Sequence, residues 1–251
     1  MIIQPTLLRE FGQKGYVVIP GVVDRFLIGR AMRKIDRLLA EQPPADHLRG
    51  PHFYWRGVGG DGPVEPFLLL LLETPAFGIA ECFVSPARLD VPQQAQVALN
   101  IPTFHHRPGG PHIDGLTPPE PSGRPGTFTM LAGVFLTDQQ FEDMGNLWVW
   151  RGTHLSSAAY FREHGADVLL SSAPYPPVTL PVPEQVLARA GDLLLAHYML
   201  GHNIGGNTSS TMRRVVYFRL QCNGHRQYWR ECAQDALREF QPVQAAVDCH
   251  Y

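Results

Sequence analysis

The sequence predicts a mainly β protein of the α+β class, with a sandwich or barrel core and flanking helices. Glycine and proline are both frequent, with 24 and 23 residues in a chain of 251, and they favour the many turns of a β core with long loops. From about residue 93 onward, short segments of β-prone residues alternate with loops rich in glycine and proline. That spacing is typical of a sandwich or barrel.

The composition is that of a globular chain, with 44% hydrophobic and 18% charged residues, and the length suits a single domain over residues 1–251. The formal net charge is −2, so we expect no nucleic acid and no membrane as a partner. The longest apolar run, residues 67–72, is far shorter than the roughly 18–20 residues of a membrane span. We expect a monomer or a homodimer.

The N-terminus shows no basic region followed by an apolar stretch, which is the pattern of a secretory signal. The four cysteines form no CxxC pair, and reduced thiols are the simplest interpretation. Both observations favour a cytoplasmic protein.

Residues 1–92 are expected to form N-terminal helices and lid-like loops. Asp24 is a helix cap, and Pro43 with Pro44 ends the helix that follows it. In order, we expect a helix over 7–15, a strand over 16–20, a helix over 24–41, a glycine-rich loop over 45–65 and a helical segment over 66–86.

Residues 93–222 carry the predicted β core, and residues 223–251 form a tail with a weak helical pattern. The core strands are expected at 95–104, 127–136, 147–150, 193–199 and 214–222.

The sharpest local feature is His112-Ile113-Asp114. On an extended segment, residues two apart point to the same side, so the imidazole and the carboxylate can converge on one point. Such a short pattern is common by chance and carries little weight alone.

A second feature lies downstream, where a predicted strand delivers His202 at its end. A Gly/Asn/Ser-rich turn follows, and the next strand starts with Arg213-Arg214. Two histidines and one carboxylate form a facial triad that leaves three positions of iron open for a 2-oxo acid and oxygen. The far carboxylate of a 2-oxo diacid needs a fixed, forked cation, which arginine supplies better than lysine.

These features occur in an order that resembles the phytanoyl-CoA dioxygenase superfamily over nearly the whole chain. The similar segments are the opening strand in 11–21, the HxD pair in 112–114, a GxLxVxPGSH-like segment in 145–154, and the stretch 191–213 with the distal histidine, an Asn-x-Ser turn and an arginine. The chain departs from the pattern at Arg151, where proline is usual, and at Thr153, where serine is usual.

The resemblance implies a double-stranded β-helix (a jelly roll, cupin-like) with helices outside. It implies a non-haem iron(II), 2-oxoglutarate-dependent oxygenase that uses O2, releases succinate and CO2, and oxidises a small-molecule substrate. Analogy of fold alone favours a substrate of secondary metabolism. His112, Asp114 and His202 are the implied iron ligands. Related halogenases have glycine or alanine in place of the aspartate, so Asp114 favours hydroxylation or another oxidation without halogenation.

The arginine that anchors 2-oxoglutarate is Arg213 by its spacing from His202 in the resembling family. Strand alternation favours Arg214 instead, because it shares a side with the more apolar residues of the predicted strand. A bulge after the turn would reconcile the two, and we prefer Arg213. The resemblance also places Asn100 and Thr129 as polar ligands of 2-oxoglutarate.

Candidate substrate contacts are His106, Trp150 and His154. His197 lies five residues before His202, so alternation puts it on the opposite face and favours a structural role. Two other functions remain open: a zinc-dependent hydrolase on a jelly-roll fold, in which the arginine would have no evident purpose, and a non-catalytic jelly-roll binding protein.

Overall fold

The computed structural model describes residues 3–43, 53–58, 65–115, 121–170 and 175–249, with the backbone alone for 53–58. Its strands are β1 (Tyr16–Ile19), β2 (Phe53–Val58), β3 (Ala95–Asn100), β4 (Met130–Phe135), β5 (Leu147–Trp150), β6 (Glu184–Gln185), β7 (Leu193–His197), β8 (Gly201–Ile204) and β9 (Arg213–Leu220). Its α-helices are α1 (Pro5–Lys14), α2 (Arg25–Glu41), α3 (Pro66–Leu72), α4 (Ala76–Val84), α5 (Thr153–His164), α6 (Trp229–Gln234) and α7 (Gln241–Asp248). A 3-10 helix, η2, covers Ala166–Leu170.

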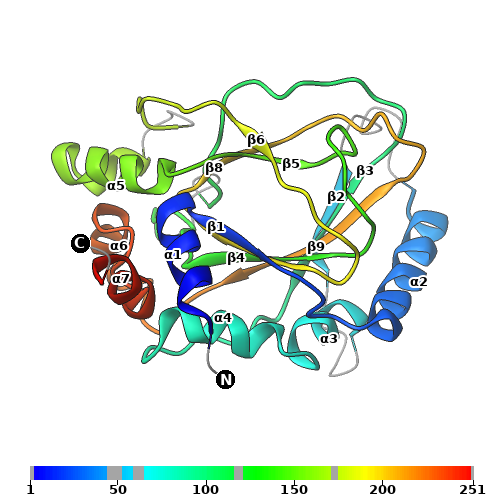
Figure 1. Ribbon diagram of the computed structural model, residues 1–251, viewed down its shortest axis with the longest axis horizontal. Helices are drawn as coiled ribbons and strands as arrows, with labels where there is room; N and C mark the ends of the chain where they lie inside the picture. The colour runs from blue at the N-terminus through cyan, green and yellow to red at the C-terminus, as the bar shows by residue number, and fades with distance from the viewer. Residues whose placement is uncertain (1–2, 44–52, 59–64, 116–120, 171–174, 250–251) are drawn as a thin grey trace.

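The strands form two sheets (Figure 1). The larger sheet has six strands in the order β1-β7-β4-β9-β3-β2, and the smaller has three in the order β6-β5-β8. The paired strands of both sheets run antiparallel. The expected α+β class with a β core is therefore confirmed.

The larger sheet is buried on both of its faces. One face packs against α1, α2, α3, α4 and α7, with Phe11, Phe83 and Phe218 in the shared core. The other face packs against the smaller sheet together with α5 and α6, and Leu131 and Val149 lie in this second core. In Figure 1 the helices accordingly lie at the left, the bottom and the right of the strands.

Most of the predicted elements are present. Asp24 caps α2 by accepting a hydrogen bond from the amide of Leu27, and α1 ends at Gly15 as expected. The helical segment over 66–86 is two helices, α3 and α4. No single helix of the described chain is long and apolar enough to cross a membrane; α3 and α4 meet that test only as a pair, bent by 53°.

Among the described residues, five elements were not predicted: β2, β6, β8, α5 and η2. The lid-like loop expected over 45–65 lies largely outside the described residues, and within it 53–58 form β2, which pairs with β3. The segments of β6 and β8 are short and poor in β-branched residues, so their strand character comes from pairing with β5.

Candidate metal centre

The imidazoles of His112 and His202 are brought together by their backbones. The amide of each residue donates to the carbonyl of the other, at 3.0 and 3.2 Å. Side chains of directly opposed residues in an antiparallel pair stand on the same face. The two ring centroids are accordingly 4.4 Å apart. His202 lies in β8, whereas His112 lies in the connection between β3 and β4.

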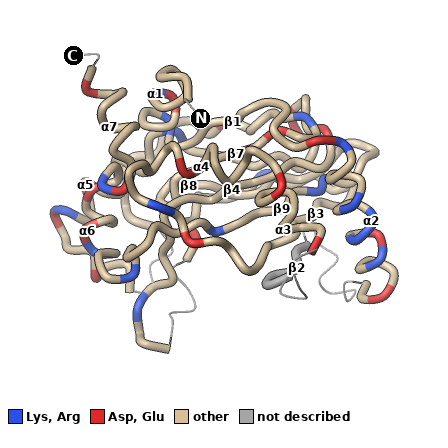
Figure 2. The backbone as a smooth tube through the Cα atoms, turned by 90° about the horizontal axis from the view of Figure 1, so that it is seen from below, with Lys and Arg blue, Asp and Glu red and all other residues tan. Residues whose placement is uncertain are grey.

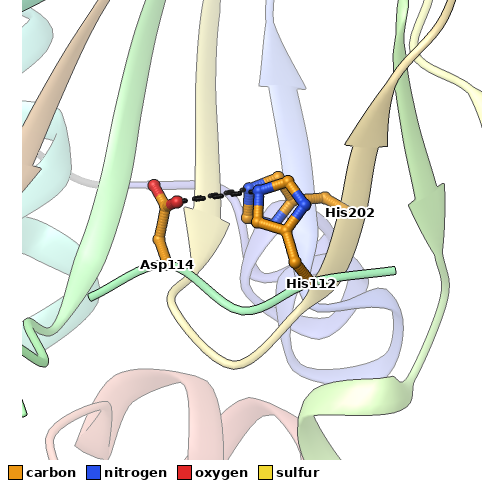
Figure 3. A group of neighbouring side chains, drawn as sticks. All are labelled: His112, Asp114 and His202. Carbon is orange, nitrogen blue, oxygen red and sulfur yellow. Dashed lines mark ion pairs between the residues drawn. The ribbon is translucent and has the colours of Figure 1, made fainter. Parts of the chain in front are cut away.

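Asp114 points at the same two rings (Figure 3). Its Oδ1 lies 3.8 Å from His112 Nε2 and 3.9 Å from His202 Nε2. The potential ligand atoms of the three residues all lie within 4.8 Å of one another. The expectation that His112 and Asp114 converge on one point, with His202 nearby, is therefore confirmed as geometry, although Asp114 lies at the start of a turn rather than on extended backbone.

This group fits a metal ion better than a hydrogen-bonded cluster. Contacts of 3.8 and 3.9 Å are too long for hydrogen bonds. Two ligands that each lie about 2.0–2.2 Å from a common ion are at most about 4.4 Å apart, so one ion can bridge them. His202 Nδ1 donates to the carbonyl of Leu200 at 2.9 Å, which leaves the Nε2 lone pair for a ligand bond.

The surroundings of Asp114 favour its charged form. Burial alone would raise the pKa of this carboxyl, but His202, Arg219 and His112 together lower the pKa below its ordinary value. Arg219 Nη2 also donates to Asp114 Oδ2 at 3.0 Å. Asp114 is thus an ionised carboxylate with Oδ1 turned towards the histidines and Oδ2 held by an arginine.

Arg213 is a buried cation on the same cavity, with 1% of its surface exposed. Its guanidinium donates to the neutral oxygens of Gln139 (3.1 Å), Asn100 (3.3 Å) and Tyr217 (2.5 Å). Within the described chain no carboxylate lies at ion-pair distance from Arg213. A buried charge is costly unless it is paired, so this arrangement indicates a site for an anionic ligand.

The register of β9 decides between the two arginines. Arg213 pairs with Asn100 of β3 and faces the cavity, whereas Arg214 points outward to an ion pair with Asp36 of α2 at 2.7 Å. The expected bulge is not needed, because β9 pairs with β3 in regular register. The more apolar side of β9 is the one that packs against the helices, so apolarity did not identify the inner side.

One glycine makes room for this arginine. Gly145 has a φ of +79°, and a Cβ there would lie 2.7 Å from Asn100 Cβ and 3.2 Å from Arg213 Cδ. Any side chain at this position would therefore meet both residues and strain the backbone. The absence of a side chain at Gly145, two residues before β5, thus lets the backbone pack closely against Asn100 and Arg213.

A cavity of about 200 Å³ joins the histidine-aspartate group to Arg213. Its wall includes Asn100, as predicted, and three residues that sequence reasoning missed: Gln96, Tyr217 and Arg219. On β9, side chains at every second residue share a side, so Tyr217 and Arg219 lie on the same side as Arg213. Once Arg213 is known to face the cavity, both residues can be predicted to line it.

Thr129 does not reach this cavity. Its hydroxyl donates to Glu239 at 2.9 Å and accepts a hydrogen bond from the amide of Cys222 at 2.8 Å, and its side chain is fully buried. The expected contact with 2-oxoglutarate is therefore corrected: Thr129 precedes β4 and links it to the C-terminal tail.

Two of the three expected substrate contacts lie in the protein core. Trp150 is three residues from the cavity residue Leu147 on β5, so alternation turns it to the other side, and it is buried there. His154 lies in α5, is fully buried, and donates from Nε2 to the carbonyl of Gly12 at 3.1 Å. Both expectations are corrected, because neither side chain borders the cavity.

The third expected substrate contact, His106, is exposed at a separate surface recess that it shares with His105 and Asp143. It does not border the cavity either. His197 is buried, and its Nε2 donates to the carbonyl of Ala236 at 2.9 Å, in agreement with the structural role expected for it.

A second group of potential metal ligands consists of His225, Cys232 and Glu239. Their polar atoms are already engaged with one another and with neighbouring threonines: His225 Nδ1 lies 2.9 Å from Glu239 Oε2, and its Nε2 lies 3.0 Å from Thr127 Oγ1. Burial raises the pKa of the Cys232 thiol, which opposes the thiolate that a metal requires. This group stabilises the tail by hydrogen bonding, and Cys222 and Cys232 are both buried thiols.

The chain combines two antiparallel sheets, helices on the outside and a His-Asp-His group between the sheets. This combination can be compared with known proteins. No protein-family model matches the sequence, and no curated protein matches it. Solved structures do match over most of the chain.

Three of these structures illustrate the likeness. The epimerase SnoN, in complex with Fe3+, alpha ketoglutarate and nogalamycin RO, is 20% identical over 84% of this chain and 80% of its own, with a TM-score of 0.62. The non-heme alpha ketoglutarate dependent carbocyclase SnoK from nogalamycin biosynthesis is 18% identical over 88% and 85%, with a TM-score of 0.61. HygX from Streptomyces hygroscopicus, with nickel and 2-oxoglutarate bound, is 19% identical over 88% and 87%, with a TM-score of 0.60. At these identities the likeness is one of fold.

Proposed function

We propose that this chain is a non-haem iron(II), 2-oxoglutarate-dependent oxygenase that acts on a small molecule. The observation that carries the proposal is Arg213: a buried cation without a carboxylate partner in the described chain, on the same cavity as a compact His-Asp-His group. A hydrolytic zinc site would need the ligand group but not the arginine. The fold likeness to enzymes whose names include alpha ketoglutarate supports the same conclusion.

In this proposal His112, Asp114 and His202 hold the ion through one nitrogen, one oxygen and one nitrogen. Three protein ligands leave positions open for the co-substrate and O2. The backbone pair between the two histidines fixes the separation of their rings, and Leu200 fixes the tautomer of His202. The two sheets would then form the double-stranded β-helix expected for such a site.

Arg213 would bind the distal carboxylate of 2-oxoglutarate, because its planar fork matches a carboxylate. Asn100 and Tyr217 hold the guanidinium in place from β3 and from β9 itself, and Asn100 is in turn fixed by donating to the carbonyl of Gly205 at 2.8 Å. The arginine is thus positioned before any ligand arrives, which lowers the cost of ordering it on binding.

When bound, iron, 2-oxoglutarate and O2 supply the oxidation, with succinate and CO2 as the co-products. The contribution of the chain is to orient the substrate beside the ion and to limit the access of water. Because Asp114 provides a carboxylate ligand where halogenases have none, we propose an oxidation without halogenation, and hydroxylation as its simplest form. The structural neighbours include an epimerase and a carbocyclase, so this fold also supports other outcomes.

The test is the metal and co-substrate requirement of the purified chain. Apoprotein reconstituted with iron(II) is expected to convert 2-oxoglutarate to succinate slowly without substrate, and zinc(II) is expected not to replace iron. A matched pair of variants, Arg213→Met and Arg214→Met, separates the arginine of the cavity from its outward neighbour. Succinate formation that is independent of iron, or lost equally in both variants, would contradict the proposal.

A further inference from the structure

Arg219 is a second arginine on the inner face of β9. It lies six residues after Arg213 on the same strand, so the two backbones are separated by roughly 20 Å at about 3.3 Å per residue. Both arginines border the cavity. They therefore lie towards different ends of it.

The environment of Arg219 differs from that of Arg213. Its side chain is 35% exposed, and its guanidinium lies over the ring of Phe128 at 5.6 Å from the ring centroid. Its carboxylate partner in the described chain is Asp114, through Nη2 at 3.0 Å. A guanidinium has five N–H donors, so this contact leaves donors for a ligand beside the metal centre.

Arg219 shares its carboxylate partner, Asp114, with the proposed metal centre, so Asp114 cannot balance both charges. This step rests on the proposed function. The two positive charges of iron(II) would be balanced by Asp114 and by the chelating carboxylate of 2-oxoglutarate, and Arg213 by the distal carboxylate. Asp114, Arg213 and Arg219 are the charged side chains among the described residues of the wall, apart from the histidines. One positive charge therefore remains, at Arg219.

A recess of about 400 Å³ adjoins the cavity at this arginine. It shares Gln96, Tyr217 and Arg219 with the cavity, so the two spaces adjoin at these three side chains. The rest of its described wall is largely polar: Asp90, Gln93, Gln94, Gln221 and Arg226, with Val91, Pro92 and Ala95. A volume of this order matches sites for small molecules. Figure 2 shows that basic and acidic residues are otherwise interspersed along the chain.

We propose that the prime substrate carries a carboxylate, which pairs with Arg219, and that its body occupies the glutamine-rich recess. A carboxylate fits the fork of an arginine and would complete the charge balance beside the ion. Amide side chains both donate and accept, so hydroxyl or amide groups of the substrate find partners there. A polycationic substrate would meet Arg219 and Arg226 in the described wall of the recess against the single carboxylate of Asp90, and is disfavoured.

The test uses small probes that do not depend on the scaffold of the substrate. The protein is loaded with cobalt(II), which is paramagnetic, and saturated with 2-oxoglutarate without O2. Nuclear relaxation is then measured for acetate, acetamide, ethylammonium and inorganic phosphate. The proteins compared are the wild type, Arg219→Gln, Arg219→Lys and the control Arg107→Gln, which changes an exposed arginine outside the cavity and the recess. Metal content and 2-oxoglutarate binding are measured first on every sample.

We expect the wild type and Arg107→Gln to relax acetate at least about fivefold more than acetamide or ethylammonium. Arg219→Gln should lose this preference, and Arg219→Lys, which keeps the charge, should retain part of it. A preference that survives in Arg219→Gln, or that is absent from a wild type loaded with metal and 2-oxoglutarate, overturns the proposal, and relaxation of phosphate alone overturns the carboxylate. A wild type that binds neither metal nor 2-oxoglutarate contradicts the proposed function instead.

Discussion

Replacing Arg213 by methionine should remove most of the affinity for 2-oxoglutarate while leaving the metal in place. The guanidinium is buried and held by Gln139, Asn100 and Tyr217, so it meets the distal carboxylate in a fixed geometry away from bulk water. A charge-assisted pair of this kind is worth about 1.5–3 kcal/mol. That free energy corresponds to an increase of about 10- to 150-fold in the dissociation constant.

The assay is calorimetric titration of 2-oxoglutarate into the nickel-loaded protein, with metal content measured on the same samples. Arg214→Met is the matched control, because Arg214 pairs with Asp36 on the outer side of β9, where an ion pair contributes at most about 1 kcal/mol to stability. Unchanged affinity in Arg213→Met, or a larger loss in Arg214→Met, would refute the assignment of the arginine and with it the register argument.

Three further predictions follow from the same geometry. His202→Ala should lose the metal on dialysis, because two ligands make a weak site; retention of one equivalent by elemental analysis would contradict the His-Asp-His assignment. Gly145→Ala should weaken 2-oxoglutarate binding more than metal binding, because its Cβ would displace the side chains of Asn100 and Arg213; equal affinity by calorimetry would contradict the close approach. Burial lowers the pKa of His154 to about 4 from 6.5, so the unfolded chain takes up a proton that the folded chain refuses, and stability falls as pH falls from 6.5 towards 4. The loss from His154 is about 2 kcal/mol at pH 5, and urea unfolding at pH 7 and pH 5 should show a smaller loss for His154→Gln than for the wild type.

The parts of the site that follow from local geometry were predictable from the sequence. The spacing of His112 and Asp114, two residues apart, predicts that both side chains lie on one side, and the structure brings them together with Asp114 at the start of a turn. The position of His202 opposite His112 required a pairing between segments 90 residues apart, which the order of motifs indicated but no local pattern encodes.

The choice between Arg213 and Arg214 shows where local reasoning ends. Alternation separates the two side chains but does not say which side faces the cavity. β9 is buried on both faces, so its apolar side marks the contact with the helices rather than the site. The contact of Arg214 with Asp36 on α2, which decides the matter, joins residues 178 positions apart.

Two of the corrected expectations, those for Thr129 and His154, share a physical cause. Thr129 and His154 are both satisfied by distant partners, Glu239 and the carbonyl of Gly12, which no spacing in the sequence reveals. His154 also lies in the first turn of the unpredicted helix α5, whose weakly amphipathic sequence gives little helical signal. The sequence therefore places both residues at the site, whereas the partner of Thr129 lies in the C-terminal tail and the partner of His154 lies in α1.

The most direct measurement of the central claim is an anaerobic titration of the apoprotein with iron(II) and then 2-oxoglutarate, followed by visible absorption. Chelation of iron by the 2-oxo acid should produce a charge-transfer band at one equivalent of each. The band should be absent in His112→Ala, which lacks an imidazole of the His-Asp-His group, and present in the control variant Arg214→Met. Iron that binds to the wild type without the band, or a band that persists in His112→Ala, would contradict the account.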